Sequence, residues 1–158
     1  MAAKPASLAF LLLLLGVVLR PSEAAQALYA PGALFSGQSL TVGNYRFTMQ
    51  ADCNLVLYDR GRAIWASGTA RRGINCVLRM QRDGNLVVYT PGGRAIWASG
   101  TNRGAGNYYL TLQSDRNVVI YGPDGRAIWA TNTKALSKGI RRWVGGVMRR
   151  TTRSTPTS

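Results

Sequence analysis

The chain repeats itself at a fixed interval, and this repetition limits the folds that it can adopt. The hexapeptide Gly-Arg-Ala-Ile-Trp-Ala occurs at 61–66, 93–98 and 125–130, which places Trp65, Trp97 and Trp129 at equal spacing. Periods of roughly 20 to 50 residues are typical of proteins built from similar units, because one such unit is too small to bury its own apolar face. The sequence therefore predicts three units around a shared centre, with the three tryptophans as core residues.

A second string recurs upstream of each tryptophan. The pattern Gln-x-Asp-x-Asn-x-Val-x-Tyr is complete at 50–58, 81–89 and 113–121. Short runs such as Tyr45–Met49 and Leu55–Tyr58 are rich in β-forming residues and bounded by Gly, Asp, Asn or Pro, which is typical of strands. Asp and Asn are favoured in tight turns, so Asp-x-Asn between two such runs predicts that each string forms a hairpin. A second turn follows each tyrosine, and we expect about four short strands in each unit and about twelve in all.

The first residues of the chain indicate its compartment. Lys4 precedes an apolar run from Leu8 to Leu19, which is followed by small residues up to Ala25. This is the pattern of a signal peptide, and the run is too short for a membrane-spanning helix, which needs about 20 apolar residues. We expect residues 1–24 to be a signal peptide, cleaved after residue 24 or 25, and the mature protein to be secreted or vacuolar.

The numbers of cysteine and histidine residues limit the metal-binding and catalytic chemistry that the chain can carry out. The chain has two cysteines, Cys53 and Cys76, and no histidine. In an oxidising compartment the pair is most simply interpreted as one disulfide that ties the first hairpin to the next repeat, worth roughly 3 kcal/mol. Ligands for a metal are scarce, so we expect no metal and no cofactor. We expect no enzyme either, because no serine or cysteine lies beside a plausible base and the aspartates repeat rather than pair in one cleft.

The net charge of +14 is unevenly distributed, with +7 of it in residues 134–158. In residues 26–133 the arginines are spread through turns and repeat joints, which predicts a solvated basic surface rather than a nucleic-acid site. Residues 134–158 place apolar side chains at helical spacing beside basic ones, before an end rich in Thr, Ser and Pro. A retained helix of this kind would dock on a membrane surface, the only membrane contact that we expect.

The three motif copies, the recurring tryptophan and the cysteine pair resemble the monocot mannose-binding lectins of the snowdrop (bulb-type) family, over about residues 26–133. The resemblance implies an all-β, β-prism II fold with three four-stranded antiparallel sheets about a pseudo-threefold axis. It also implies one metal-independent mannose site per sheet, a homodimer or tetramer formed through the C-terminal strand, and a role in plant defence. For residues 134–158 it implies a propeptide that is removed, which leaves two interpretations of that segment.

The repeated chemistry of the motif suits a sugar. Gln, Asp, Asn and Tyr together offer the mixed donors and acceptors that vicinal hydroxyls need, because each hydroxyl both donates and accepts. In the family the Asp and Asn hold O2 of mannose, the Gln reaches O3, the Tyr reaches O4, and the Val contacts the C3–C4 edge. The resemblance thus implies a first site of Gln50, Asp52, Asn54, Val56 and Tyr58, a second site of Gln81, Asp83, Asn85, Val87 and Tyr89, and a third site of Gln113, Asp115, Asn117, Val119 and Tyr121.

Two other interpretations compete with sugar binding. Asp-x-Asn builds turns in any case, and a storage or taste-modifying protein could use the same scaffold without significant sugar binding. One observation counts against both interpretations. The three copies keep the same polar residues at the motif positions, whereas the residues between them, Ala51, Arg82 and Ser114, differ from copy to copy. If one site fails we expect it to be the third, since Val118 replaces the leucine found in the other two copies, a mild packing change.

Overall fold

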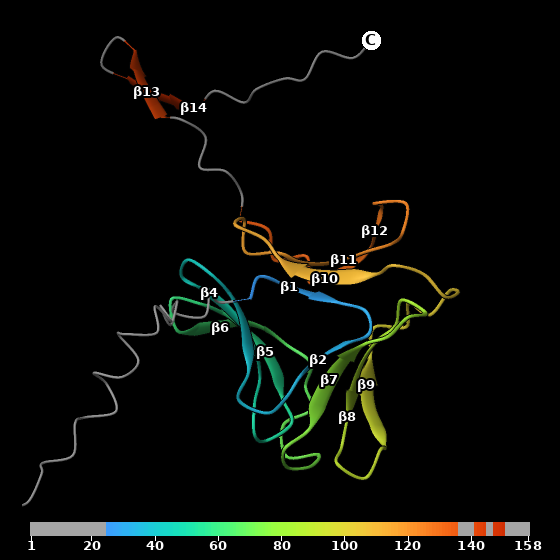
Figure 1. Ribbon diagram of the computed structural model, residues 1–158. Helices are drawn as coiled ribbons and strands as arrows, with labels where there is room; N and C mark the ends of the chain where they lie inside the picture. The colour runs from blue at the N-terminus through green and yellow to red at the C-terminus, as the bar shows by residue number, and fades with distance from the viewer. Residues whose placement is uncertain (1–24, 136–140, 145–146, 151–158) are drawn as a thin grey trace, which may run out of the picture.

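The computed structural model describes residues 25–135 and, for the backbone, residues 141–144 and 147–150. Within residues 25–135 it has twelve strands in three four-stranded antiparallel sheets. The predicted β-prism architecture is confirmed, and Figure 1 shows the three sheets as the sides of one prism. The predicted signal peptide and most of residues 134–158 lie outside the described residues.

The sheets are numbered here after the motif copy that each contains. The first sheet has the order β3 (Ser39–Val42), β4 (Tyr45–Met49), β5 (Leu55–Asp59) and β6 (Arg62–Ala66). The second has the order β2 (Gly32–Leu34), β7 (Val77–Met80), β8 (Leu86–Tyr89) and β9 (Ala95–Ala98). The third has the order β1 (Ala27–Tyr29), β10 (Tyr109–Leu112), β11 (Val118–Tyr121) and β12 (Ala127–Ala130).

The expectation of four strands per repeat is wrong. Each repeat supplies three strands, and the N-terminal segment 27–42 supplies the fourth strand of every sheet. Residues 67–76, which precede β7, contain no run of alternating apolar residues from which a strand could form. The open edges of β10 and β7 are paired instead by β1 and β2, which satisfies backbone groups that would otherwise lack partners.

The core lies between the sheets and takes alternate residues of each central strand. In β5, for example, Leu55 and Leu57 belong to the core cluster and are fully buried, whereas Val56 between them does not belong to it. The same alternation holds in β8 and β11. Because side chains of a strand point to opposite faces in turn, the residues between the core positions face outward.

The three tryptophans meet as predicted. Ring centroids of Trp65, Trp97 and Trp129 are separated by 5.9, 5.8 and 5.9 Å, and each pair is arranged edge to face. Edge-to-face contacts of this kind are favourable because the positive ring edge meets the negative face. The tryptophans are half-buried and pack against the fully buried core rather than forming it.

The tail differs from its prediction. β13 (Arg141–Val144) and β14 (Val147–Arg150) pair with each other as an antiparallel hairpin, so the helix expected from the spacing of apolar residues is wrong for these positions. The physical reason lies in the sequence Trp-Val-Gly-Gly-Val, since Gly-Gly between β-formers is a hairpin signal. Among the residues that the structure describes, no helix is long and apolar enough to cross a membrane.

Candidate functional site

The Asp-x-Asn step of each motif is a turn, as predicted. Its middle residue has a left-handed backbone in all three copies, with φ of 69° at Cys53, 87° at Gly84 and 64° at Arg116. In each copy Oδ1 of the aspartate accepts a hydrogen bond from the asparagine N–H, at 3.0, 3.0 and 3.1 Å. The turn therefore holds the aspartate and asparagine side chains in the same relative position three times.

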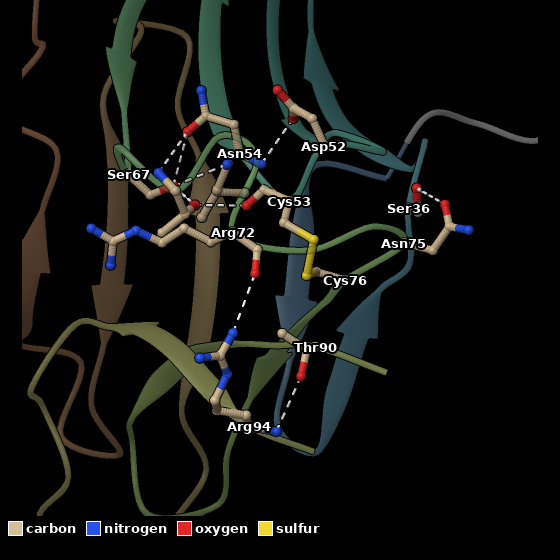
Figure 2. Close-up of a disulfide and its surroundings, with 12 residues drawn as sticks. Ser36, Asp52, Cys53, Asn54, Ser67, Arg72, Asn75, Cys76, Thr90 and Arg94 are labelled. Atoms are coloured by element: carbon tan, nitrogen blue, oxygen red, sulfur yellow. Dashed lines mark hydrogen bonds between the residues drawn. A yellow bond between two sulfur atoms is a disulfide. The ribbon is translucent and has the colours of Figure 1, made fainter. Parts of the chain in front are cut away.

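The asparagine is fixed by a second set of bonds. Oδ1 of Asn54 accepts from the Ser67 hydroxyl at 3.3 Å and from the Thr69 N–H at 3.2 Å, and Figure 2 shows this side chain turned toward Ser67. Oδ1 of Asn85 accepts from Ser99 and Thr101 in the same way. With this oxygen engaged, the amide nitrogen of the asparagine stays available as a donor.

Sequence reasoning missed these anchoring hydroxyls. The third copy uses Thr131 and Thr133 on Asn117. In all three copies a threonine hydroxyl also donates to the carbonyl of the left-handed turn residue, at 2.6 to 2.7 Å. The signal was present, because a Ser/Thr-x-Thr segment directly follows each copy of the hexapeptide, at 67–69, 99–101 and 131–133.

The glutamine and tyrosine of each motif also converge. The glutamine Nε2 donates to the tyrosine hydroxyl, at 2.5 Å from Gln50 to Tyr58, 2.8 Å from Gln81 to Tyr89 and 2.9 Å from Gln113 to Tyr121. The motif valine lies between them in the sequence and on the same outward face of the strand. The three valines are nevertheless only 2%, 2% and 3% exposed.

Each motif thus gathers four half-buried polar side chains on one face of its sheet. Internal bonds engage one aspartate oxygen, the asparagine oxygen and one glutamine N–H. What remains is the second aspartate oxygen and the glutamine oxygen as acceptors, and the asparagine amide and the tyrosine O–H as donors. Two acceptors and two donors in one patch suit a ligand with adjacent hydroxyls, whereas the covered valines leave it little apolar area.

The three sites are not identical. Oδ2 of Asp115 pairs with the Lys134 ammonium at 3.4 Å, whereas among the described residues the matching oxygens of Asp52 and Asp83 have no ion pair. Val118 is fully buried in the core cluster and does not face the site. The group that distinguishes the third site is therefore Lys134, a residue that the motif comparison did not consider.

The disulfide supports the first turn. Cys53 and Cys76 are bonded, with Cα atoms 5.0 Å apart, which confirms the predicted pairing. Figure 2 shows Asp52 and Asn54 on either side of Cys53, so the cross-link holds the backbone from which both side chains project. Within the described residues no group of three or more His, Cys, Asp or Glu side chains is placed to hold a metal ion.

Solved structures with the same fold are similar to this chain over almost their whole length. A mannose-binding lectin structure from Gastrodia elata, described as monomeric, is 59% identical with a TM-score of 0.69, covering 70% of this chain and 100% of that one. The mannose-specific agglutinin of snowdrop (Galanthus nivalis), complexed with methyl-α-D-mannoside, is 50% identical with a TM-score of 0.61, covering 70% and 98%.

Curated relatives align over shorter segments. The mannose-specific lectin of Galanthus nivalis is 46% identical over 89 residues, 56% of this chain and 57% of the relative's length. Curculin-2 of Molineria latifolia is 52% identical over 56 residues, 35% of each chain. The chain therefore spans about half the length of the curated relatives that it matches, and no protein-family model matches it.

The fold is that of the β-prism class of carbohydrate-binding proteins. With 59% identity over the full Gastrodia structure and 50% over nearly all of the snowdrop one, this chain belongs to the monocot, bulb-type mannose-binding lectin family. Members of this family are carbohydrate-binding proteins rather than enzymes.

Proposed function

We propose that this chain binds mannose and mannose-containing glycans at its three motif sites without a metal ion. The observation that carries the proposal is that the first two hairpins leave two acceptors and two donors free on one half-buried patch, and the third presents the same groups with its second aspartate oxygen paired to Lys134. Adjacent hydroxyls of a pyranose require such alternating partners, because an unpaired polar group in a partly buried site costs free energy.

The assignment of groups to hydroxyls follows the family resemblance. The second aspartate oxygen accepts from O2 of mannose and the asparagine amide donates to it, so the axial O2 distinguishes mannose from its C2 epimer, glucose. The glutamine reaches O3, and the tyrosine O–H reaches O4. Mannose as the ligand is supported by two similar solved lectins, which are described as complexed with methyl-α-D-mannoside and with a monomannoside.

One such site is shallow and is expected to bind a single sugar weakly, on the order of millimolar. Three sites on one chain raise the avidity for branched glycans because the second and third contacts become intramolecular. We therefore expect branched mannose glycans to be preferred over free mannose.

A retention experiment tests the proposal. The purified protein is expected to bind mannan resin and to be released by methyl α-mannoside but not by galactose. A matched control replaces the second carboxylate oxygen in every site, as Asp52→Asn, Asp83→Asn and Asp115→Asn together, since an asparagine can still accept the turn hydrogen bond. Retention of this variant, or retention of the native chain that methyl α-mannoside does not reverse, would instead support the storage or taste-modifying alternative.

Assembly into a homodimer or tetramer through the C-terminal strand stays a prediction. In the structure β12 pairs with β11 of its own chain, and Thr131 and Thr133 bond Asn117 within the same repeat. Strand exchange would have to break and remake these bonds, and the similar Gastrodia lectin is described as monomeric. Sedimentation equilibrium of the purified protein decides the matter, because a monomer mass at all concentrations would overturn the predicted oligomer.

Secretion, vacuolar sorting, plant defence and removal of residues 134–158 also remain predictions. The intact mass of the protein purified from its native tissue tests the processing steps. A mass that begins near residue 25 and stops near residue 134 is expected if both terminal segments are removed. A mass that includes Ser158 would favour the alternative of a retained tail on a membrane surface, which binding to anionic vesicles would then test.

A further inference from the structure

The outward face of the third sheet carries a row of three tyrosines, which we call the tyrosine row. Tyr29 of β1, Tyr109 of β10 and Tyr121 of β11 are direct cross-strand partners. Their rings are stacked, with centroids 5.4 Å apart from Tyr29 to Tyr109 and 5.3 Å apart from Tyr109 to Tyr121. The row spans two strand spacings, roughly 10 Å, and starts at a residue of the third site.

The row lies on the same outward face as the site. Each tyrosine has a core residue as a direct neighbour in its strand: Leu28 precedes Tyr29, Leu110 follows Tyr109, and Ile120 precedes Tyr121. Since successive side chains of a strand point to opposite faces, the tyrosines point away from the core. Tyr29 is 67% exposed although it is a large aromatic residue, and β1 is an edge strand, so the outer face of its ring is open.

The matching positions of the other two sheets hold different chemistry. Beside Tyr58 of the first site lies Arg46, whose guanidinium carbon is 5.7 Å from the ring centroid, followed by Thr41 on the edge strand. Beside Tyr89 of the second site lies Val77, and β2 ends at Leu34, before the level of Val77. The exposed Phe35 directly follows β2, next to the level of Val77, so the second sheet also has an aromatic residue at this end. Within the described residues, the third site is the one that continues into a row of stacked tyrosines.

We propose that the tyrosine row is an extended subsite for the second sugar of an oligomannoside whose terminal mannose occupies the third site. This rests on the proposed mannose-binding function. A pyranose ring has an apolar C–H face that packs on an aromatic ring and a rim of hydroxyls that bond phenols, and Tyr29 and Tyr109 offer both. The row holds no charged side chain, so its ligand is a neutral sugar, in contrast to the first site with its exposed Arg46.

The side chains of the tyrosine row are also held in place before a ligand binds. Gln113 holds the Tyr121 hydroxyl, and Tyr121 stacks on Tyr109, which in turn stacks on Tyr29. Rigid aromatic side chains lose little conformational entropy when a ligand binds, so contact with them is converted efficiently into affinity.

The test isolates the third site in the full chain. Asp52→Asn and Asp83→Asn disable the first two sites, and calorimetry then compares methyl α-mannoside with the α1,2-, α1,3- and α1,6-linked mannobioses. At least one mannobiose is expected to bind more tightly than methyl α-mannoside. Tyr29→Ala and Tyr109→Val are each expected to weaken that mannobiose between about threefold and tenfold, while methyl α-mannoside changes less than about twofold.

The control is Thr41→Ala, the matching edge-strand position of the first sheet, which is expected to leave both affinities unchanged. If methyl α-mannoside itself does not bind, the proposed function fails and not only the subsite. If it binds but Tyr29→Ala leaves the ratio of the two affinities unchanged, the subsite is overturned. A lower molar mass of the Tyr29→Ala variant in sedimentation, with that ratio unchanged, would overturn it in favour of an interface between copies of this chain.

Discussion

At the scale of single residues, the asparagine of each motif performs two tasks with its two amide atoms. The oxygen accepts bonds from the Ser/Thr-x-Thr segment, and the nitrogen remains free toward solvent. The interpretation of Asp-x-Asn as a turn and its interpretation as a ligand are therefore compatible. The turn bonds engage one atom of each side chain, and the other atom is left for a ligand.

Substitution of Asn85 separates these tasks. Asn85→Asp keeps an acceptor for Ser99 and loses the amide donor, so we expect binding at the second site to be lost while the fold is retained. Asn85→Ala removes both, and the unpaired groups of Ser99 and Thr101 are expected to cost about 1–3 kcal/mol of stability. Calorimetric stoichiometry and thermal unfolding measure the two effects; a full set of three sites in Asn85→Asp contradicts the donor role.

Lys134 is expected to weaken the third site, because its ammonium engages the aspartate oxygen that the other two sites leave free. Lys134→Ala is predicted to raise the mannoside affinity of that site by up to about fivefold, the scale of an exposed ion pair of about 1 kcal/mol. Lys134→Arg retains the charge and serves as the control. Titration with methyl α-mannoside, in the variant whose first two sites are disabled, gives the affinity. An unchanged affinity for Lys134→Ala would show that Lys134 does not affect this site.

At the scale of elements, the turn of each hairpin decides where the ligands point. The left-handed residue is Gly84 in the second copy but Cys53 and Arg116 in the others, which adopt this conformation at a cost. Local bonds offset the cost. The disulfide holds Cys53, and the Arg116 side chain donates to the Thr133 carbonyl and pairs with Asp59.

Gly84 cannot be replaced by a larger residue without steric conflict. Its φ is +87°, and a Cβ there would lie 2.6 Å from the ring of buried Tyr108. Gly84→Ala is therefore predicted to lower the free energy of unfolding by at least about 1–3 kcal/mol. Gly92→Ala, at an exposed turn with nothing within 4 Å, is the matched control and is expected to stay within about 0.5 kcal/mol of the native chain. Urea unfolding monitored by tryptophan fluorescence compares them, and equal losses would contradict the steric argument.

At the scale of the whole molecule, two covalent or ionic ties join neighbouring repeats. Cys53–Cys76 ties the first turn to the start of β7, and Arg116–Asp59 ties the third turn to the end of β5 at 3.2 Å. The disulfide restricts the unfolded chain over a separation of 23 residues, whereas the ion pair is partly exposed and screened.

These ties are expected to differ in strength. Replacing both Cys53 and Cys76 with serine is predicted to lower stability by about 3 kcal/mol, whereas Asp59→Asn is predicted to lower it by about 1 kcal/mol or less. The serine variant is also expected to weaken the first site more than the other two, because the disulfide holds the backbone between Asp52 and Asn54. Chemical unfolding and calorimetry measure both effects, and a loss for Asp59→Asn as large as that for the serine variant would contradict the ranking.

The sequence by itself determined whatever depends on residues close together along the chain. The regular spacing of the three units is visible in the letters alone, and the hairpin at each Asp-x-Asn and the convergence of Gln50 with Tyr58 arise within one motif. The disulfide also followed from the sequence, because two cysteines in one small domain leave one pairing. The sugar assignment came from the resemblance rather than from these local rules.

Tertiary structure alone decided which distant segments complete the sheets. Tyr29 meets Tyr109 only because β1 pairs with β10, a strand from the last repeat, and no local propensity encodes that choice. The contact of Lys134 with Asp115 was likewise not visible in the motif, because it depends on how the chain after β12 folds back on the turn of its own repeat. Backbone groups at an open strand edge accept whichever segment the closed prism brings to them, so these contacts depend on the whole fold rather than on any one motif.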